Sequence, residues 1–266
     1  MNSKESETPK HQTDNETRGS KMHTHHRSTE LIVALDFPRA DRALDMVDQL
    51  KDLPIIYKVG FELFMGGGSE VVRELVHRKA RVFLDLKFHD IPNTVAKAAR
   101  MAALLHVEMF TLHLAGGSAM IRAAAQELEA IPSLRPKMLG VSVLTSFDDV
   151  RWAEVTKSLT GHAASVEDSV DGLVQHAAGW GADGVVCSAH ELESIREAFP
   201  NLYTVVPGIR PAGSEAGDQA RVMTPAQAHQ LGASAVVIGR PITAAQEPRQ
   251  VVENILKDLS LGALSA

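Results

Sequence analysis

Eight short runs of apolar, largely β-branched residues recur along the chain from residue 31 onward. Each run is almost continuously apolar, as expected for parallel strands that are covered on both faces. Stretches with helical spacing lie between the runs, notably 93–105, 165–181 and 251–262. We therefore predict alternating strands and helices, with strands at 31–37, 55–61, 81–88, 107–114, 137–145, 183–189, 202–209 and 234–240.

Eight successive strand–helix units favour one α/β fold in particular, a single (β/α)8 TIM barrel of eight parallel strands. A doubly wound open sheet is the structural alternative. However, no glycine-rich dinucleotide fingerprint follows the first run, where residues 35–41 read LDFPRAD. We expect one barrel domain over residues 29–266.

Residues 1–28 contain almost no apolar side chains, so they can bury little surface and are predicted to form a disordered polar tail. This stretch also lacks the apolar segment of a secretory signal. His23, His25 and His26 form a small cluster that could bind a metal weakly, and we interpret it as part of a solvated tail.

The composition is ordinary for a globular protein, with 44% hydrophobic and 23% charged residues, and the formal net charge is −6. These values do not favour nucleic acid as a partner. No apolar run approaches the roughly 18 residues that indicate a membrane-spanning helix. The single cysteine, Cys187, lies in an apolar run and is predicted to be a buried strand residue, consistent with a reducing, cytoplasmic compartment.

Charged and polar residues follow several predicted strands, at the end where barrel enzymes carry their active sites. Charged groups are costly inside a barrel unless they are paired, so several of them on one rim indicate a functional site. The residues are Asp36, Lys58, Asp85, Lys87, Asp90, Thr145, Arg210 and Arg240.

The third predicted strand, RVFLDLKF at 81–88, is the most informative. Asp85 and Lys87 are two residues apart, so both should face the barrel mouth, while Leu84 and Leu86 face the helices. A surface ion pair is the alternative, but the apolar residues around the pair argue against exposure.

The residues beyond this strand have alternative interpretations. Asp90 precedes Pro92 and could cap the following helix. His89 and His113, with the neighbouring acids, could suggest a metal site, but their spacing matches no recognised ligand pattern, so we predict no metal.

The eighth strand ends in Gly239 and Arg240. Glycine lets the backbone approach an anion closely, and arginine can hold a phosphate with two hydrogen bonds. The glycine-rich segment 207–225 follows the seventh strand and fits a loop that folds over a ligand, with a merely flexible connection as the alternative.

These motifs together resemble the orotidine 5'-phosphate decarboxylase family, and the bacterial branch most closely. DLKFHDIPNT at 85–94 resembles the signature of the family, and 207–221 and 237–242 resemble its phosphate-binding segments. The resemblance covers nearly all of residues 30–258. It implies decarboxylation of orotidine 5'-phosphate to UMP and CO₂, the last step of UMP biosynthesis, without a cofactor.

The resemblance also implies roles for individual residues. A network of alternating charge would comprise Lys58, Asp85, Lys87 and Asp90. The enzyme would be a homodimer in which Asp90 and Thr94 reach the site of the neighbouring subunit. Substrate contacts would come from Asp36 and Lys58 to the ribose, Ser142 and Thr145 around the pyrimidine, and Arg210, Gln219, Gly239 and Arg240 around the phosphate.

Such a site suits this reaction because loss of CO₂ leaves a carbanion at C6 that the ring cannot delocalise well. A fixed ammonium, which we assign to Lys87, can stabilise that charge and then deliver the proton. A carboxylate of Asp85 or Asp90 would also disfavour the bound substrate carboxylate.

Three alternatives remain at this stage. They are an Mg²⁺-dependent sugar-phosphate decarboxylase of the same superfamily, a Schiff-base aldolase using Lys58 or Lys87, and a non-catalytic phosphate-binding barrel.

Overall fold

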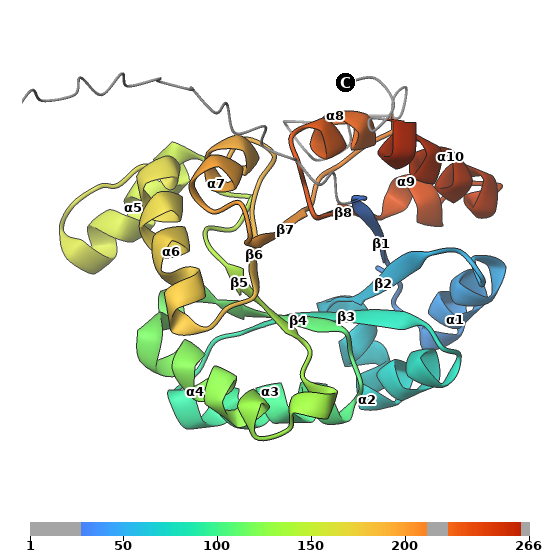
Figure 1. The fold of residues 1–266 in the computed structure, drawn as a ribbon, viewed down its shortest axis with the longest axis horizontal. Coiled ribbons are helices and arrows are strands. Elements are labelled where there is room, and N and C mark those ends of the chain that lie inside the picture. Colours follow the sequence, from blue (N-terminus) through green and yellow to red (C-terminus); the bar gives the residue numbers. More distant parts are fainter. Residues whose placement is uncertain (1–27, 212–222, 262–266) are drawn as a thin grey trace, which may run out of the picture.

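The computed structural model describes residues 28–211 and 223–261. Its strands form a closed parallel barrel in sequence order, surrounded by helices (Figure 1). This confirms the predicted barrel and rules out the open sheet. The strands are β1 (Glu30–Ala34), β2 (Ile55–Val59), β3 (Arg81–Phe88), β4 (Met109–His113), β5 (Lys137–Val141), β6 (Gly184–Val186), β7 (Tyr203–Val206) and β8 (Ala235–Ile238).

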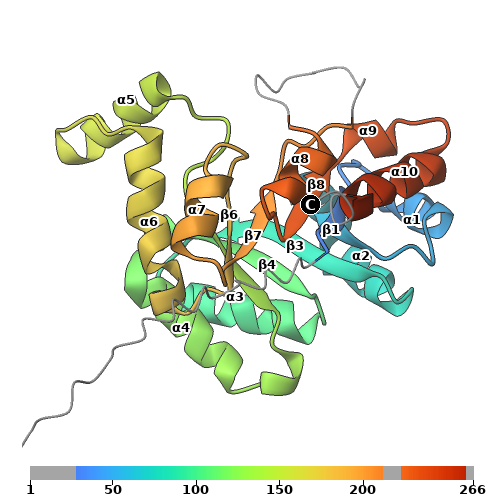
Figure 2. The ribbon, with the colours of Figure 1, turned by 45° about the horizontal axis from the view of Figure 1, so that its top comes forward.

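Helices cover the outside of the barrel and connect successive strands (Figure 2). The three helical stretches predicted from the sequence are confirmed as α3, α6 and α10. Pro92 occupies the first turn of α3, and the Ser165 side chain caps α6 by accepting from Asp168 N–H. The helices are α1 (Ala40–Gln49), α2 (Phe61–His77), α3 (Pro92–Leu104), α4 (Gly117–Glu129), α5 (Asp149–Thr160), α6 (Val166–Trp180), α7 (Leu192–Ala198), α8 (Pro225–Gln230), α9 (Arg240–Thr243) and α10 (Pro248–Leu261), with single turns η1 (Leu114–Gly116) and η2 (Pro132–Leu134).

Most strands end earlier than the apolar pattern predicted. The run at 137–145 continues past the end of β5, for example, because Val143 stays buried in the loop that leads to the barrel mouth. Cys187 is buried as predicted, but it follows β6 instead of lying within it. Hydrophobicity reports burial, and a buried loop gives the same signal as a buried strand. Most of the predicted tail lies outside the described residues.

The barrel interior is filled by one side chain in two along each strand. The pairing register places these inward residues side by side around the barrel, as Ile32 lies beside Ile56 and Phe83 beside Met109. Gly184 occupies an inward position where an added Cβ would lie 2.2 Å from the Tyr203 carbonyl oxygen. The interior cluster comprises Ile32, Ala34, Ile56, Phe83, Met109, Leu139, Val205, Ala235 and Val237.

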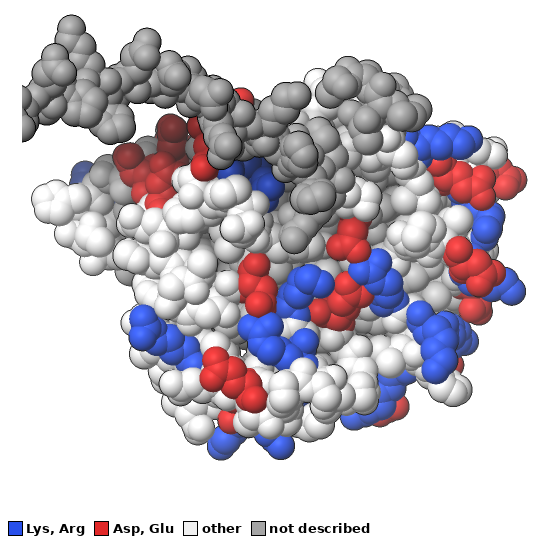
Figure 3. Space-filling view, viewed as in Figure 1, with Lys and Arg blue, Asp and Glu red and all other residues white. Residues whose placement is uncertain are grey.

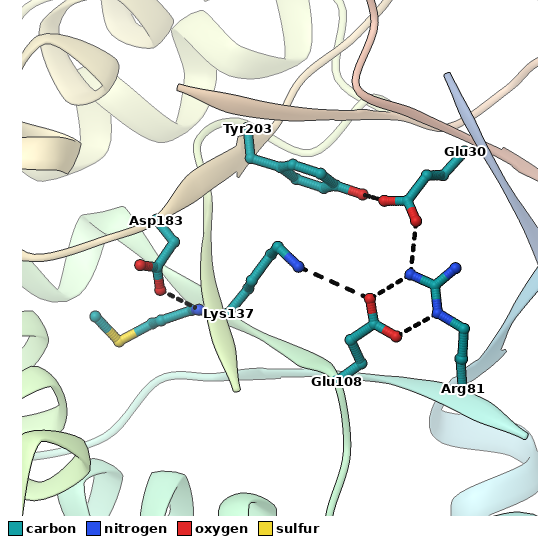
Figure 4. Close-up of polar contacts among 7 residues, drawn as sticks. Glu30, Arg81, Glu108, Lys137, Asp183 and Tyr203 are labelled. Carbon is teal, nitrogen blue, oxygen red and sulfur yellow. Dashed lines mark hydrogen bonds and ion pairs between the residues drawn. The ribbon is translucent and has the colours of Figure 1, made fainter. Parts of the chain in front are cut away.

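A chain of polar contacts crosses the amino-terminal end of the barrel (Figure 4), and the contact of Lys137 with the Tyr203 ring closes it into a ring. Arg81 donates to Glu30 Oε1 at 2.6 Å and to Glu108 Oε2 at 2.6 Å. Tyr203 Oη donates to Glu30 at 2.6 Å, and Lys137 Nζ lies 3.7 Å from Glu108 and 5.4 Å from the Tyr203 ring centre. Four of these residues begin β1, β3, β5 and β7, so the ring joins alternate strands. We call these five residues the floor ring.

Acidic and basic side chains are interspersed on the face seen in Figure 3, and no patch of one sign covers it. The helices of the described residues include none long and apolar enough to span a membrane.

Candidate active site

A cavity of about 130 Å³ opens at the carboxyl ends of the strands. Its polar wall comes from Lys58 on β2 and from Asp85 and Lys87 on β3. The structure therefore confirms that Asp85 and Lys87 lie on the same side, toward the barrel mouth. The remaining wall is mostly apolar and consists of Phe83, Val141, Val143, Leu144, Thr145, Val186, Val205, Pro207 and Val237.

Asp85 is the centre of the polar wall. Its Oδ1 accepts hydrogen bonds from Lys87 Nζ and from Thr111 Oγ1, each at 2.9 Å, and its Oδ2 lies 3.7 Å from Lys58 Nζ. Lys58 Nζ also donates to Asp36 Oδ1 at 3.2 Å. Only 14% of the Asp85 side chain and 26% of the Lys87 side chain is exposed. Four charged groups of alternating sign are thus held together at the mouth. The charges of Lys58, Asp85 and Lys87 have little solvent around them and therefore interact strongly.

Thr111 on β4 is a site residue that the sequence analysis missed. It is fully buried, accepts from the Lys87 backbone N–H at 2.8 Å and donates to Asp85. The Lys87 backbone adopts a left-handed φ of 45°, and the pairing of β3 with β4 is irregular between Leu84 and Phe88. Thr111 therefore replaces a missing ladder contact and holds a strained residue in place. In the sequence, the indication of this role is a single hydroxyl side chain within the apolar run at 107–114.

Asp90 and Thr94 lie outside this network. Both are exposed, and Asp90 Oδ1 accepts from the Ile91 N–H at 2.6 Å. Helix α3 begins after Ile91 without a side-chain cap, so the capping role considered for Asp90 is wrong. Within the described part of the chain, Asp90 forms no ion pair. Of the four residues predicted to form the charge network, Lys58, Asp85 and Lys87 are joined and Asp90 is not.

Ser142 and Thr145 lie on the loop after β5. Thr145 lines the cavity, whereas Ser142 stands between the lining residues Val141 and Val143. The Ser142 hydroxyl is buried and has no hydrogen-bond partner among the described residues. An orphaned buried hydroxyl costs free energy, so a ligand atom or a water is its expected partner.

The predicted phosphate residues follow the adjacent strands β7 and β8. Arg210 is buried, its backbone N–H donates to Met223 O at 3.0 Å, and its Nε has no partner within residues 28–211 and 223–261. Gly239 precedes α9, where an added Cβ would lie 3.6 Å from Asp36 Oδ2, and Arg240 is exposed as the first residue of α9. Gln219 lies outside the described residues.

Histidine and carboxylate side chains of the described residues are not gathered in any group of three or more that could hold a metal ion. His89 and His113 do lie together, with ring centres 5.4 Å apart.

The sequence model of the Orotidine 5'-phosphate decarboxylase / HUMPS family matches residues 29–255. The chain belongs to the orotidine 5'-phosphate decarboxylase family. This family comprises two groups of proteins, and individual relatives show which of the two groups the chain resembles. The chain is 47% identical over 231 residues to orotidine 5'-phosphate decarboxylase of Legionella pneumophila strain Paris, covering 86% of this chain and 99% of the relative.

Other relatives agree over similar lengths. Orotidine 5'-phosphate decarboxylase of Moorella thermoacetica is 45% identical over 241 residues, covering 89% of this chain and 94% of the relative. The crystal structure of the Lactobacillus acidophilus orotidine 5'-phosphate decarboxylase superposes with a TM-score of 0.75 at 36% identity, covering 87% of this chain and 99% of that one. The resemblance inferred from the motifs is confirmed, and the sugar-phosphate decarboxylase and binding-protein alternatives are not favoured.

Proposed function

We propose that this cavity converts orotidine 5'-phosphate to UMP and CO₂ in pyrimidine biosynthesis, with Lys87 as the catalytic acid. The observation that carries the proposal is the Lys87 ammonium held 2.9 Å from Asp85 in the cavity wall, in a chain whose near-full-length relatives are orotidine 5'-phosphate decarboxylases. A cytoplasmic location fits a step of nucleotide synthesis.

The reaction breaks the bond between C6 of the pyrimidine and its carboxylate. CO₂ leaves, and the electron pair of the broken bond stays on C6. The Lys87 ammonium stabilises this charge and then gives its proton to C6, which forms UMP, and solvent later reprotonates the amine. Fixed charges that need no reorganisation during the reaction are the strongest contribution a protein can make here.

Asp85 and Thr111 orient the ammonium. Asp85 accepts a hydrogen bond from the Lys87 ammonium and fixes its direction, while Thr111 ties Asp85 to the Lys87 backbone. Lys58 lies on the other oxygen of Asp85 and bridges to Asp36, which is the more exposed end of the network. We assign Lys58 and Asp36 to the ribose hydroxyls because they provide a donor and an acceptor at the open rim.

The pyrimidine occupies the apolar part of the cavity. Ser142 supplies the hydrogen bond to the ring, in keeping with its buried hydroxyl, which has no partner among the described residues, and Thr145 closes the wall beside it. The phosphate lies beyond the ends of β7 and β8, where Gly239 offers a backbone N–H and Arg240 and Arg210 offer guanidinium groups. We also assign Gln219 to the phosphate.

The direct test mixes purified, metal-stripped protein with orotidine 5'-phosphate and follows the loss of substrate absorbance together with CO₂ release. We expect full turnover after exhaustive chelation and no adduct trapped by borohydride. Turnover that requires added Mg²⁺ would support the sugar-phosphate decarboxylase chemistry. A trapped adduct would support a Schiff base, and nucleotide binding without CO₂ release would support a binding protein.

The change Arg240→Ala is expected to lower kcat/KM for orotidine 5'-phosphate by about 100-fold or more, since a bidentate phosphate contact supplies binding energy that organises the site. The same variant should lose almost nothing on orotidine, which lacks the phosphate. Steady-state rates on both compounds measure the difference. Equal losses on the two compounds would show that Arg240 does not act through the phosphate.

We further propose that the enzyme is a homodimer in which Asp90 and Thr94 complete the site of the neighbouring subunit. Asp90 forms no ion pair with the other residues that the structure describes, and Ile91, next to it, is 66% exposed. Phe61 and Met65 begin α2 after the adjacent strand β2 and are also largely exposed. Large apolar side chains left exposed on a subunit are typical of an interface.

Subunit mixing tests this arrangement. Lys87→Ala and Asp90→Ala proteins are each expected to be nearly inactive, but a mixed dimer contains one site with both native residues. Random reassociation should therefore restore about one quarter of the wild-type activity. Recovery should depend on subunit exchange and be absent when the two variants are assayed immediately after mixing. No recovery from exchanged dimers would place Asp90 in the site of its own chain.

A further inference from the structure

His113 is a half-buried titratable group beside the candidate active site that the mechanism above does not use. It ends β4, two residues after Thr111, and the pairing register places both side chains toward the barrel interior. Its ring lies against the ring of His89, with centres 5.4 Å apart and a 37° angle between the planes. Thr111 thus contacts Lys87, and His113, two residues further along the chain, contacts His89.

These two contacts lie on either side of Phe88, which pairs with Leu112 where the irregular part of the strand ladder ends. The pairing of β3 with β4 is irregular between Leu84 and Phe88, and the Lys87 backbone is in the left-handed region. Such a conformation persists only when its surroundings enforce it. Thr111 fixes the Lys87 backbone, and His113 contacts His89, the residue that leads to Asp90.

The electrostatic surroundings of His113 disfavour its cationic form. Burial lowers the pKa of His113 below its usual 6.5, and His89 and Lys87 lower it further, while Asp85 acts in the opposite direction. On the other side, its neighbour in register on β5 is the apolar Val141. The ring is therefore neutral at physiological pH, and a proton added to it would face the Lys87 ammonium.

We propose that neutral His113 is a positioning residue that holds the segment from Lys87 to His89 in place. Protonation of its ring then displaces this segment and lowers turnover in acid. The proposal rests on the proposed function, because Lys87 is the group that it positions. An imidazolium there repels the Lys87 ammonium.

The test measures kcat/KM for orotidine 5'-phosphate from pH 5 to pH 8.5 for the wild type and for His113→Gln. Dividing one by the other at each pH cancels the ionisation of the substrate phosphate, whose second pKa is about 6. We expect the ratio of wild type to variant to fall by about fivefold or more from pH 7.5 to pH 5, because only the wild type gains the charge. A flat ratio overturns the proposal.

His89→Gln supplies an independent test on an exposed side chain. It removes a group that lowers the pKa of His113, so the fall of kcat/KM in acid should begin at a higher pH. His113→Gln should have the opposite effect and make the fall in acid shallower. His77→Gln is the matched control, since this exposed histidine lies in the last turn of α2. A purely structural role for the ring pair would lower activity equally at every pH.

Titration of the histidine ring signals by NMR follows His113 directly in the free protein, even if His113→Gln folds poorly. Protonation of His113 at the pH where wild-type turnover falls supports the proposal, and a ring that stays neutral through that range overturns it. If the wild-type protein released no CO₂, the proposed function itself would be wrong. Active wild type with a flat ratio rejects only the role of His113.

Discussion

Replacing Lys87 with alanine is expected to lower kcat for orotidine 5'-phosphate by about 10⁴-fold or more, because one side chain performs two tasks. It stabilises the charge on C6 and supplies the proton, and each task alone is commonly worth about 10²-fold or more. The loss should fall mainly on kcat, since the phosphate and ribose contacts lie on other strands.

Single-turnover and steady-state measurements on Lys87→Ala, with nucleotide binding measured separately, check this expectation. Lys257→Ala is the matched control, because this exposed lysine lies on α10, and its activity should equal that of the wild type. UMP formation by Lys87→Ala within tenfold of the wild type would mean that another group carries the proton. The proposed assignment of the catalytic residues would then be wrong.

The second large effect concerns stability and the floor ring. Arg81→Met is expected to lower the free energy of unfolding at pH 7 by about 2–3 kcal/mol, since it leaves the carboxylates of Glu30 and Glu108 without their main partner. The value is below that for a fully buried ion pair because 41% of the Arg81 side chain is exposed. Catalysis should survive, since the floor ring lies at the opposite end of the barrel from the cavity.

The same variant has a predicted pH dependence. Burial acts to raise the pKa of Glu30, but hydrogen bonds from Tyr203 and Arg81 outweigh it and hold the pKa below the usual 4.5. A carboxyl whose pKa is lowered by folding stabilises the protein above the pKa of the unfolded chain, and this contribution disappears as the pH falls through the folded value. The difference in the free energy of unfolding between wild type and Arg81→Met should therefore have its full value above about pH 5 and become smaller in stronger acid.

Denaturant unfolding at several pH values measures both effects. Arg39→Ala, which removes an exposed ion pair with Asp41 on the surface, serves as the control and should cause no measurable change. If the two variants had equal stability at pH 7, the floor ring would be a solvated cluster without a role in holding the barrel. A difference that grew in acid would contradict the assigned direction for Glu30.

The strand pattern was predictable from the sequence because parallel strands covered on both faces need continuous apolar runs. The ends of the strands were not predictable, as the run at 137–145 illustrates, because the loop after β5 is as buried as the strand itself. The same-side position of Asp85 and Lys87 was also predicted correctly. The strand alternation used for that prediction is nevertheless interrupted, because the Lys87 backbone leaves the extended region.

Contacts between distant segments could not be predicted from local pattern. Thr111 reads as one polar residue in an apolar run, and only its position beside Asp85 shows what its hydroxyl does. Likewise, Glu30, Arg81 and Tyr203 begin separate strands and meet only because the barrel closes.

By itself, the sequence determined which residues are buried, how many strands alternate with helices and which motif carries the charged groups, because burial and side-chain alternation act over a few neighbouring residues. The tertiary structure alone decided where each strand ends, which hydroxyl orients Asp85, how the floor ring closes and that Asp90 lies outside the charge network of the described residues. These features depend on the closure of the barrel and on its pairing register, which bring together atoms that the chain separates by tens of residues.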